Sequence, residues 1–253
     1  MEIHWSWQPA YNHTNIKFLL GLENSPNFFR GSLILGKRID ETKKALNKIN
    51  AVNEIHKAAI EYKNEVLGKK FLYVFDNRYI EVIFKKSDFR HLTGVDTKLG
   101  AKDFFNYAVN GKLKASHIFF SSVHPYELHE KKVRHIQDIS KLAKKESIIL
   151  EDISTDKESF KFGTTDLNFT ILMDLSYDDF GNPVNECYNV KSLRDEDCFK
   201  KAKNCFEVTN IFVKAYGDKK YSCLLYSDPR NKVLPKELES KIDDSIKNDF
   251  IFK

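Results

Sequence analysis

Two different spacings of hydrophobic and polar residues divide the chain. From Asp40 to Val66 apolar residues recur every three or four positions, which predicts an amphipathic helix that ends at Gly68. The same spacing predicts helices from Thr97 to Lys112 and from Tyr126 to Leu142. A last amphipathic helix is expected from Lys236 to Lys247. The longer predicted helices therefore lie in the N-terminal part of the chain.

Runs of β-branched and aromatic residues predict strands between and after these helices. Phe71–Phe75 and Tyr79–Phe84 flank Asp76-Asn77-Arg78, which is typical of a hairpin with a short turn. Residues 116–120 fit either a strand or a helix end. Further strands are expected at residues 147–153, 160–163, 167–175, 184–190, 207–216 and 221–226, with turns at 178–183 and 217–219. The pattern predicts an α+β fold, with an antiparallel sheet of about five or more strands and the N-terminal helices packed on one side.

The first 36 residues differ in character from the rest. They are rich in aromatic side chains, including Trp5 and Trp7, and are interrupted by Pro9 and Pro26. We expect residues 1–36 to form an aromatic N-terminal arm that packs on the body or binds a partner, because such side chains are unfavourable in water. Residues 37–253 are expected to form one α+β domain, with a helical lead at 37–68, a core at 69–230 and a C-terminal tail at 231–253.

Composition narrows the classes of function. The 253 residues include 41 basic and 36 acidic side chains, and this net charge of +5 allows a nucleic-acid partner without requiring one. The four cysteines show no CxxC spacing, no secretory signal is recognisable, and no apolar run approaches the roughly 18 residues of a membrane span. We therefore expect reduced thiols in a cytoplasmic protein that does not enter a membrane.

Motifs for several common activities are missing from the sequence. It contains no glycine-rich phosphate loop and no Gly-x-Ser-x-Gly, which argues against nucleoside triphosphatases and α/β-hydrolases. His124, His129 and His135 lie close together in sequence, but their spacing does not place them on one helix face and no HExxH is present. We therefore expect no metal site and no cofactor.

The stretch from Phe84 to Asp96 concentrates side chains that move protons and bind anions, at the point where a strand is expected to pass into a turn and a helix. His91 is the best acid/base candidate, because the ordinary pKa of histidine lies near neutral pH. Arg90, with Lys85 and Lys86, supplies positive charge for a phosphate, although only one of two neighbouring strand residues shares a given face. Thr93 can position a phosphate oxygen, and His124, in an expected loop before Pro125, is a second candidate for the site.

Each of these residues also has a purely structural interpretation. A lysine pair beside a strand end commonly protects a sheet edge. His91 can equally cap a helix or form a hydrogen bond in the core, and Thr93-Gly94 can simply end a helix that Asp88 begins. The sequence alone leaves both interpretations open.

Residues 85–95, with Lys161-Phe162-Gly163 and Asp166-Leu167-Asn168-Phe169 further on, resemble the fourth class of phage-borne nucleases grouped with barnase, EndoU, the tRNA-cutting colicins and RelE. The resemblance covers roughly residues 50–175 and implies the BECR-like nuclease fold of that group. The resemblance also implies that Lys161 and Thr165 reach the site from across the sheet. The expected catalytic set is then His91, Arg90, Lys86, Thr93 and Lys161, and the expected substrate-binding set is Lys85, Thr165 and His124.

The resemblance also implies an activity. It indicates a metal-independent endoribonuclease, acting as a toxin or phage conflict effector, that cuts RNA such as tRNA or mRNA by attack of the ribose 2′-hydroxyl and leaves a 2′,3′-cyclic phosphate. RNA is then the substrate, and an antitoxin or immunity protein is the expected partner. The alternative is a non-catalytic RNA- or protein-binding module of a phage or mobile element. Salt-sensitive RNA binding that survives His91→Ala, with no cleavage by the wild type, favours that alternative.

Overall fold

The structure is a computed structural model that describes the backbone of residues 26–253 and the side chains of residues 37–253. Two compact units divide the chain, residues 1–47 and residues 48–253, and the second unit holds the sheet and the sites described below. Most of the expected aromatic arm, residues 1–25, lies outside the described residues. Helix α2 (Pro26–Glu65) begins upstream of the expected start at Asp40. No helix of the described residues combines the length and hydrophobicity needed to cross a membrane.

Of the predicted helices in the second unit, one has the bounds expected from the sequence and the others differ. Helix α5 (Tyr126–Leu142) has the predicted bounds. Helix α4 (Ala101–Val109) begins later than expected, because Asp96–Thr97 form strand β3 and pair with strand β4 (Ile118–Phe119). The remaining helical segments are α3 (Phe89–Thr93), α6 (Asp244–Lys247) and the short 3₁₀ helices η1 (Ala115–His117), η2 (Phe199–Lys201) and η3 (Lys236–Ser240).

The continuous helix expected from Lys236 to Lys247 is wrong. The tail instead forms η3, a turn and α6, and then a short strand β13 (Ile251–Phe252) that pairs in parallel with β12 (Val233–Leu234). Leu238 and Ile242 of this tail are buried, and they pack on the sheet together with Leu234 and Phe250. The demands of this packing, rather than helical spacing alone, therefore determine the path of the tail.

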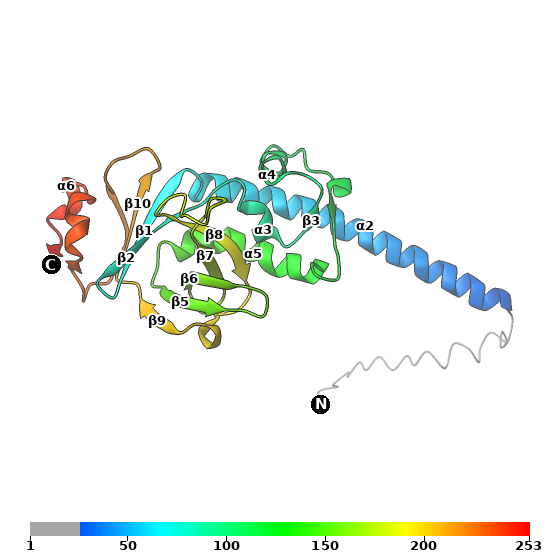
Figure 1. Cartoon of the computed structure of the whole chain (residues 1–253). Coiled ribbons are helices and arrows are strands. Elements are labelled where there is room, and N and C mark those ends of the chain that lie inside the picture. Colours follow the sequence, from blue (N-terminus) through cyan, green and yellow to red (C-terminus); the bar gives the residue numbers. More distant parts are fainter. Residues whose placement is uncertain (1–25) are drawn as a thin grey trace, which may run out of the picture. The chain divides into compact units, whose positions relative to one another are not determined.

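A nine-stranded sheet in the order β11-β10-β1-β2-β8-β7-β6-β5-β9 forms the centre of the second unit (Figure 1). Neighbouring strands run antiparallel except β2 and β8, which pair in parallel between Val82 and Tyr188 and between Ile83 and Asn189. The α+β class is confirmed, but the expectation of a purely antiparallel sheet is wrong at this pair. The strands are β1 (Lys69–Phe75), β2 (Arg78–Ile83), β5 (Ile148–Ser154), β6 (Ser159–Thr165), β7 (Thr170–Asp174), β8 (Tyr188–Arg194), β9 (Asn204–Glu207), β10 (Asn210–Ala215) and β11 (Cys223–Ser227).

The predicted hairpin between β1 and β2 is confirmed. Its turn residues Asp76 and Asn77 have φ angles of +46° and +52°. Asparagine and aspartate tolerate this left-handed conformation better than other residues with a side chain, and two such residues make the turn that matches the twist of paired strands. The local sequence therefore fixes the register of the first two strands.

The main core lies between one face of the sheet and the helices. It contains buried residues of α2, α3, α4 and α5 together with residues of both the β1–β2 and the β5–β8 parts of the sheet. Two smaller clusters cover the opposite face, one beneath the C-terminal tail and one beneath η2. On the helical side α3 contacts α4, α5 and β8, so that the stretch from 84 to 96 lies where two helices meet the end of a strand.

Candidate functional site

Helix α3 is one short turn that carries the best acid/base candidate. Phe89 and Leu92 are fully buried in the main core. This burial fixes the side of the helix on which Arg90 and His91 emerge. Gly94 ends the helix with a φ of +67°, as predicted.

Asp88 precedes α3 as expected, but it does not cap the helix with its side chain. Its carboxylate instead accepts hydrogen bonds from the Lys85 backbone N–H at 2.9 Å and from the Ser87 hydroxyl at 3.2 Å. The carboxylate thus holds the turn between β2 and α3. This turn directs the chain from the sheet into the helix that carries His91.

An open pocket of about 260 Å³ is lined by Arg90 and His91 from α3 and by Asp96 and His124 from the segments that follow. Three of the predicted site residues, Arg90, His91 and His124, therefore line the same pocket. His124 comes from the loop after β4, and Asp96 belongs to β3. The short β3–β4 ladder brings these two segments together.

His124 is held by a hydrogen-bonded carboxylate. Its Nδ1 lies 2.7 Å from Asp96 Oδ1, and the Ser121 hydroxyl donates to Asp96 Oδ2 at 2.6 Å. Burial raises the pKa of Asp96, but the hydrogen bonds from Ser121 and His124 outweigh it, and the net effect lowers the pKa. Asp96 is therefore an anion that orients the imidazole and leaves Nε2 as the nitrogen available to the pocket.

The surroundings of His91 are predominantly cationic. Desolvation of the ring, and then the charges of Arg90 and Lys132, lower the pKa of His91 below its ordinary value of 6.5, while Glu158 acts in the opposite direction. The charge of Lys191 also lowers the pKa of His91, but by a smaller amount. His91 is consequently a neutral imidazole near pH 7, with its charged form disfavoured.

Helix α5 is joined to the end of α3 by a buried histidine. His129 Nδ1 lies 2.8 Å from the carbonyl oxygen of Thr93, and its Nε2 lies 3.2 Å from a carboxylate oxygen of Glu54 on α2. Burial lowers the pKa of His129 in spite of these two acceptors. This histidine therefore connects three helices and sets the position of α5 against Gly94.

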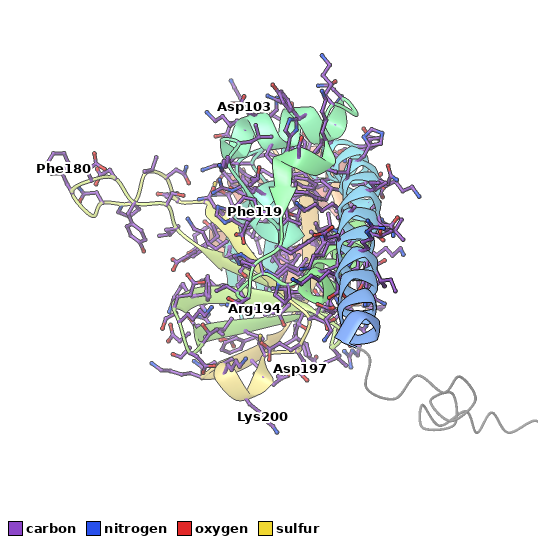
Figure 2. The ribbon with its side chains drawn as sticks, turned by 90° about the vertical axis from the view of Figure 1, so that its right-hand side faces the viewer. Asp103, Phe119, Phe180, Arg194, Asp197 and Lys200 are labelled. Carbon is purple, nitrogen blue, oxygen red and sulfur yellow. The ribbon has the colours of Figure 1, made fainter. Side chains whose placement is uncertain are left out.

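Lys132 of α5 and Arg194 at the end of β8 were not among the predicted site residues. Burial, and then the charge of Arg194, lowers the pKa of Lys132 to about 8. Lys132 is 7% exposed, and its aliphatic chain lies against Gly94. A sequence signal for it existed, because it lies three residues after the buried His129 and four before the buried Ile136, on the inward face of the helix. No comparable signal singled out Arg194, which Figure 2 labels.

The other predicted site residues do not line this pocket. Thr93 is buried and donates its hydroxyl hydrogen bond to the Arg90 carbonyl oxygen at 2.8 Å. Thr165 is buried and donates to the Phe169 carbonyl oxygen at 2.7 Å. Lys161 is exposed and pairs with Glu151 and Asp152, at 3.2 and 2.9 Å. Lys86 is exposed and Lys85 is half-buried beside the turn.

Within residues 37–253 no group of three or more histidine, cysteine, aspartate or glutamate side chains is arranged to hold a metal ion. A family model described as phage-Barnase-EndoU-ColicinE5/D-RelE like nuclease 4 matches residues 54–229. The match extends beyond the 50–175 region estimated from the motifs and includes β8, β10 and β11. Neither a curated protein nor a solved structure matches the chain.

Proposed function

The chain belongs to the fourth family of phage-borne nucleases related to barnase, EndoU, colicins E5 and D and RelE, and we propose that it cleaves RNA at the pocket of Arg90, His91, Asp96 and His124. The reaction we infer is attack of a ribose 2′-hydroxyl on the adjacent phosphorus without a metal ion. It leaves a 2′,3′-cyclic phosphate on one fragment and a 5′-hydroxyl on the other. The observation that carries the proposal is that two histidines in different electrostatic surroundings line one pocket.

Transesterification of RNA requires three chemical contributions. A base removes the proton of the 2′-hydroxyl, a cation stabilises the charge that develops on the phosphate, and an acid protonates the departing 5′-oxygen. The pocket offers candidates for all three.

We assign the base to His91. Desolvation and the neighbouring charges of Arg90 and Lys132 keep its imidazole neutral near pH 7, so that a ring nitrogen is free to accept a proton. His91 is exposed, and it emerges from α3 beside the pocket. The base therefore needs no prior proton loss at neutral pH.

We assign the acid to His124. When its ring carries both protons, Nδ1–H donates to Asp96 across 2.7 Å and Nε2–H is the proton that can be given to the leaving oxygen. The Asp96 carboxylate fixes the orientation of the ring and is itself held by Ser121. This arrangement follows the general pattern in which a carboxylate orients a catalytic imidazole.

Arg90 is the cation of this pocket that we assign to the phosphate. Its nearest polar contact among the described residues is a long one, 3.5 Å from Nη1 to the Leu99 carbonyl oxygen, so most of its donors remain available. A guanidinium binds two oxygens of a phosphate at once. The roles expected for Thr93 and Thr165 are replaced in this proposal by hydrogen bonds that hold the local backbone.

The test is incubation of the purified protein with total bacterial RNA in EDTA, followed by analysis of the fragment ends. We expect cyclic-phosphate and 5′-hydroxyl ends from the wild type, and loss of cleavage by at least about 100-fold in His91→Ala and in His124→Ala. His117→Ala is the matched control, because His117 does not line the pocket. Cleavage that EDTA abolishes, or that persists in both pocket variants, refutes the assignment.

We also propose that the activity serves conflict between a phage and its host, in the cytoplasm, with a neutralising partner protein. The phage-related family supports this proposal. Growth arrest on expression of the wild type, absent with His91→Ala, is the expected result. If the wild type instead binds RNA in a salt-sensitive manner and never cuts it, the chain is an RNA-binding module.

A further inference from the structure

Lys132 is a buried cation without a matching anion. It is 7% exposed, and within residues 37–253 its ammonium makes no hydrogen bond or ion pair. Its stem fills the space beside Gly94, where an added Cβ would lie 3.1 Å from Lys132 Cδ. The stem therefore packs beside Gly94, which lines the pocket, and the side chain is buried instead of extending into solvent.

Arg194 has the same deficiency at the end of β8. Its Nε is buried and has no hydrogen-bond partner among the described residues. Its nearest carboxylate is that of Glu158, 3.9 Å from Nη2, which is the outer limit of an ion pair. Glu158 lies in the turn between β5 and β6, and its side chain is more than half exposed.

Asp195, the residue after Arg194, places the end of β8 against α5. Asp195 lies 2.6 Å from His135 Nε2 and 3.2 Å from Lys131 Nζ, both on α5. Arg194 is close enough to Lys132 for its charge to be the second largest cause of the lowered pKa of Lys132. The fold thus holds two cations near each other, and the one carboxylate that acts on Lys132, Glu158, is largely in solvent.

Such an arrangement is unfavourable unless an anion completes it. Burial of a charged group carries a desolvation cost that a partner of opposite charge offsets. We propose that Lys132 and Arg194 form a binding site for a phosphate group, and, as a deepening of the proposed function on which this part rests, that the group is a phosphodiester of the RNA next to the His91 pocket. An ammonium and a guanidinium together offer the donors that phosphate oxygens accept.

A structural role for Lys132 makes a different prediction. A cation near the C-terminal end of α3 interacts favourably with the helix dipole and stabilises the fold. If this is the role of Lys132, its removal changes stability and leaves the affinity for phosphate unaltered. The buried Nε of Arg194 and the exposed Glu158 are not explained by that role. In our proposal the Glu158 carboxylate competes weakly with the phosphate for Lys132 and Arg194.

The first experiment measures binding of inorganic phosphate by calorimetry, with no nucleic acid present. We expect Lys132→Gln and Arg194→Gln each to weaken binding roughly tenfold or more, because each removes one charged hydrogen-bond donor. Glu158→Gln is expected to tighten binding several-fold, because it removes the competing carboxylate. Lys141→Gln is the matched control, since it makes the same charge change at an exposed site of α5.

The second experiment measures binding of a 2′-deoxy oligonucleotide, which lacks the attacking hydroxyl. The same order of affinities is expected, with Glu158→Gln strongest and the Lys132 and Arg194 variants weakest. Opposite changes from Glu158→Gln and Lys132→Gln are not produced by general damage to the fold. Equal affinities of all variants for both ligands overturn the site, whether or not the wild type cleaves RNA.

The two proposals fail separately. Phosphate binding that depends on Lys132 and Arg194, in a protein that leaves RNA intact, supports the site and refutes the ribonuclease. Cleavage that depends on His91, with phosphate binding insensitive to Lys132 and Arg194, supports the ribonuclease and refutes the site.

Discussion

Replacement of Lys132 by methionine should make the protein more stable at pH 7. Burial, and then Arg194, lowers the pKa of Lys132 from its ordinary value of 10.5 to about 8. This difference corresponds to about 3 kcal/mol of unfavourable free energy in the folded state with Lys132 charged, because one pKa unit is worth about 1.4 kcal/mol. The methionine has a similar length and fills the space beside Gly94 without a charge.

Part of this gain is offset. Loss of a cation near the end of α3 removes up to about 1 kcal/mol of favourable interaction with the helix dipole. We therefore expect Lys132→Met to raise the free energy of unfolding by about 2 kcal/mol at pH 7. The same substitution removes a proposed phosphate ligand, so that stability and phosphate binding change in opposite directions.

Urea denaturation at pH 7 and at pH 9.5, followed by circular dichroism, tests this prediction. The destabilisation from a charged Lys132 is fully present below pH 8 and is lost as the pH rises from about 8 toward 10.5, since the unfolded chain there binds a proton that the folded chain has released. The advantage of Lys132→Met should consequently shrink at pH 9.5. Lys141→Met, at an exposed site, should change stability by less than about 0.5 kcal/mol. A loss of 1 kcal/mol or more in Lys132→Met at pH 7 would refute the reasoning and make Lys132 a structural cation.

Three further substitutions test the pocket and its surroundings. Arg90→Gln should move the acidic limb of the kcat/KM profile for RNA cleavage to higher pH, because the Arg90 charge lowers the pKa of His91; an unmoved limb means that another group is the base. Asp96→Asn should lower kcat roughly tenfold or more with little change in KM, and should add no further loss in a His124→Ala background. Gly94→Ala should lower the free energy of unfolding by roughly 1–2 kcal/mol more than Gly68→Ala, because both residues have positive φ but only at Gly94 does the added Cβ meet a neighbour, Lys132 Cδ at 3.1 Å.

Those parts of the fold that depend on local spacing could be predicted from the sequence. Helix α5 has the expected bounds, and the turn at Asp76-Asn77 gives the β1–β2 hairpin its register. The parallel pairing of β2 with β8 could not be predicted, because the two strands are about 100 residues apart in sequence and meet through only two residue pairs. The continuous helix predicted for residues 236–247 is wrong for a similar reason, since packing of the tail on β1 and β10 outweighs its helical spacing.

The candidate site divides in the same way. Arg90 and His91 are adjacent in sequence, and the burial of Phe89 and Leu92 directs both toward solvent, so a local motif was sufficient to find them. His124 is identifiable from the sequence because it lies in an expected loop before Pro125. Asp96, Lys132 and Arg194 are brought to this region by β3–β4 pairing, by the packing of α5 and by the end of β8, which are long-range contacts that no short motif encodes.

The construction of the site explains why its cations remain unneutralised. His129 bonds to the Thr93 carbonyl oxygen, and its backbone lies directly against Gly94, where a Cβ would come within 3.5 Å of the His129 Cα. Lys132, three residues after His129, lies against Gly94, and its ammonium forms no ion pair within residues 37–253. Asp195, which directly follows β8, is already bonded to His135 and Lys131. The same contacts that position His91 thus keep a positive charge beside it, which lowers its pKa and leaves a place for a phosphate.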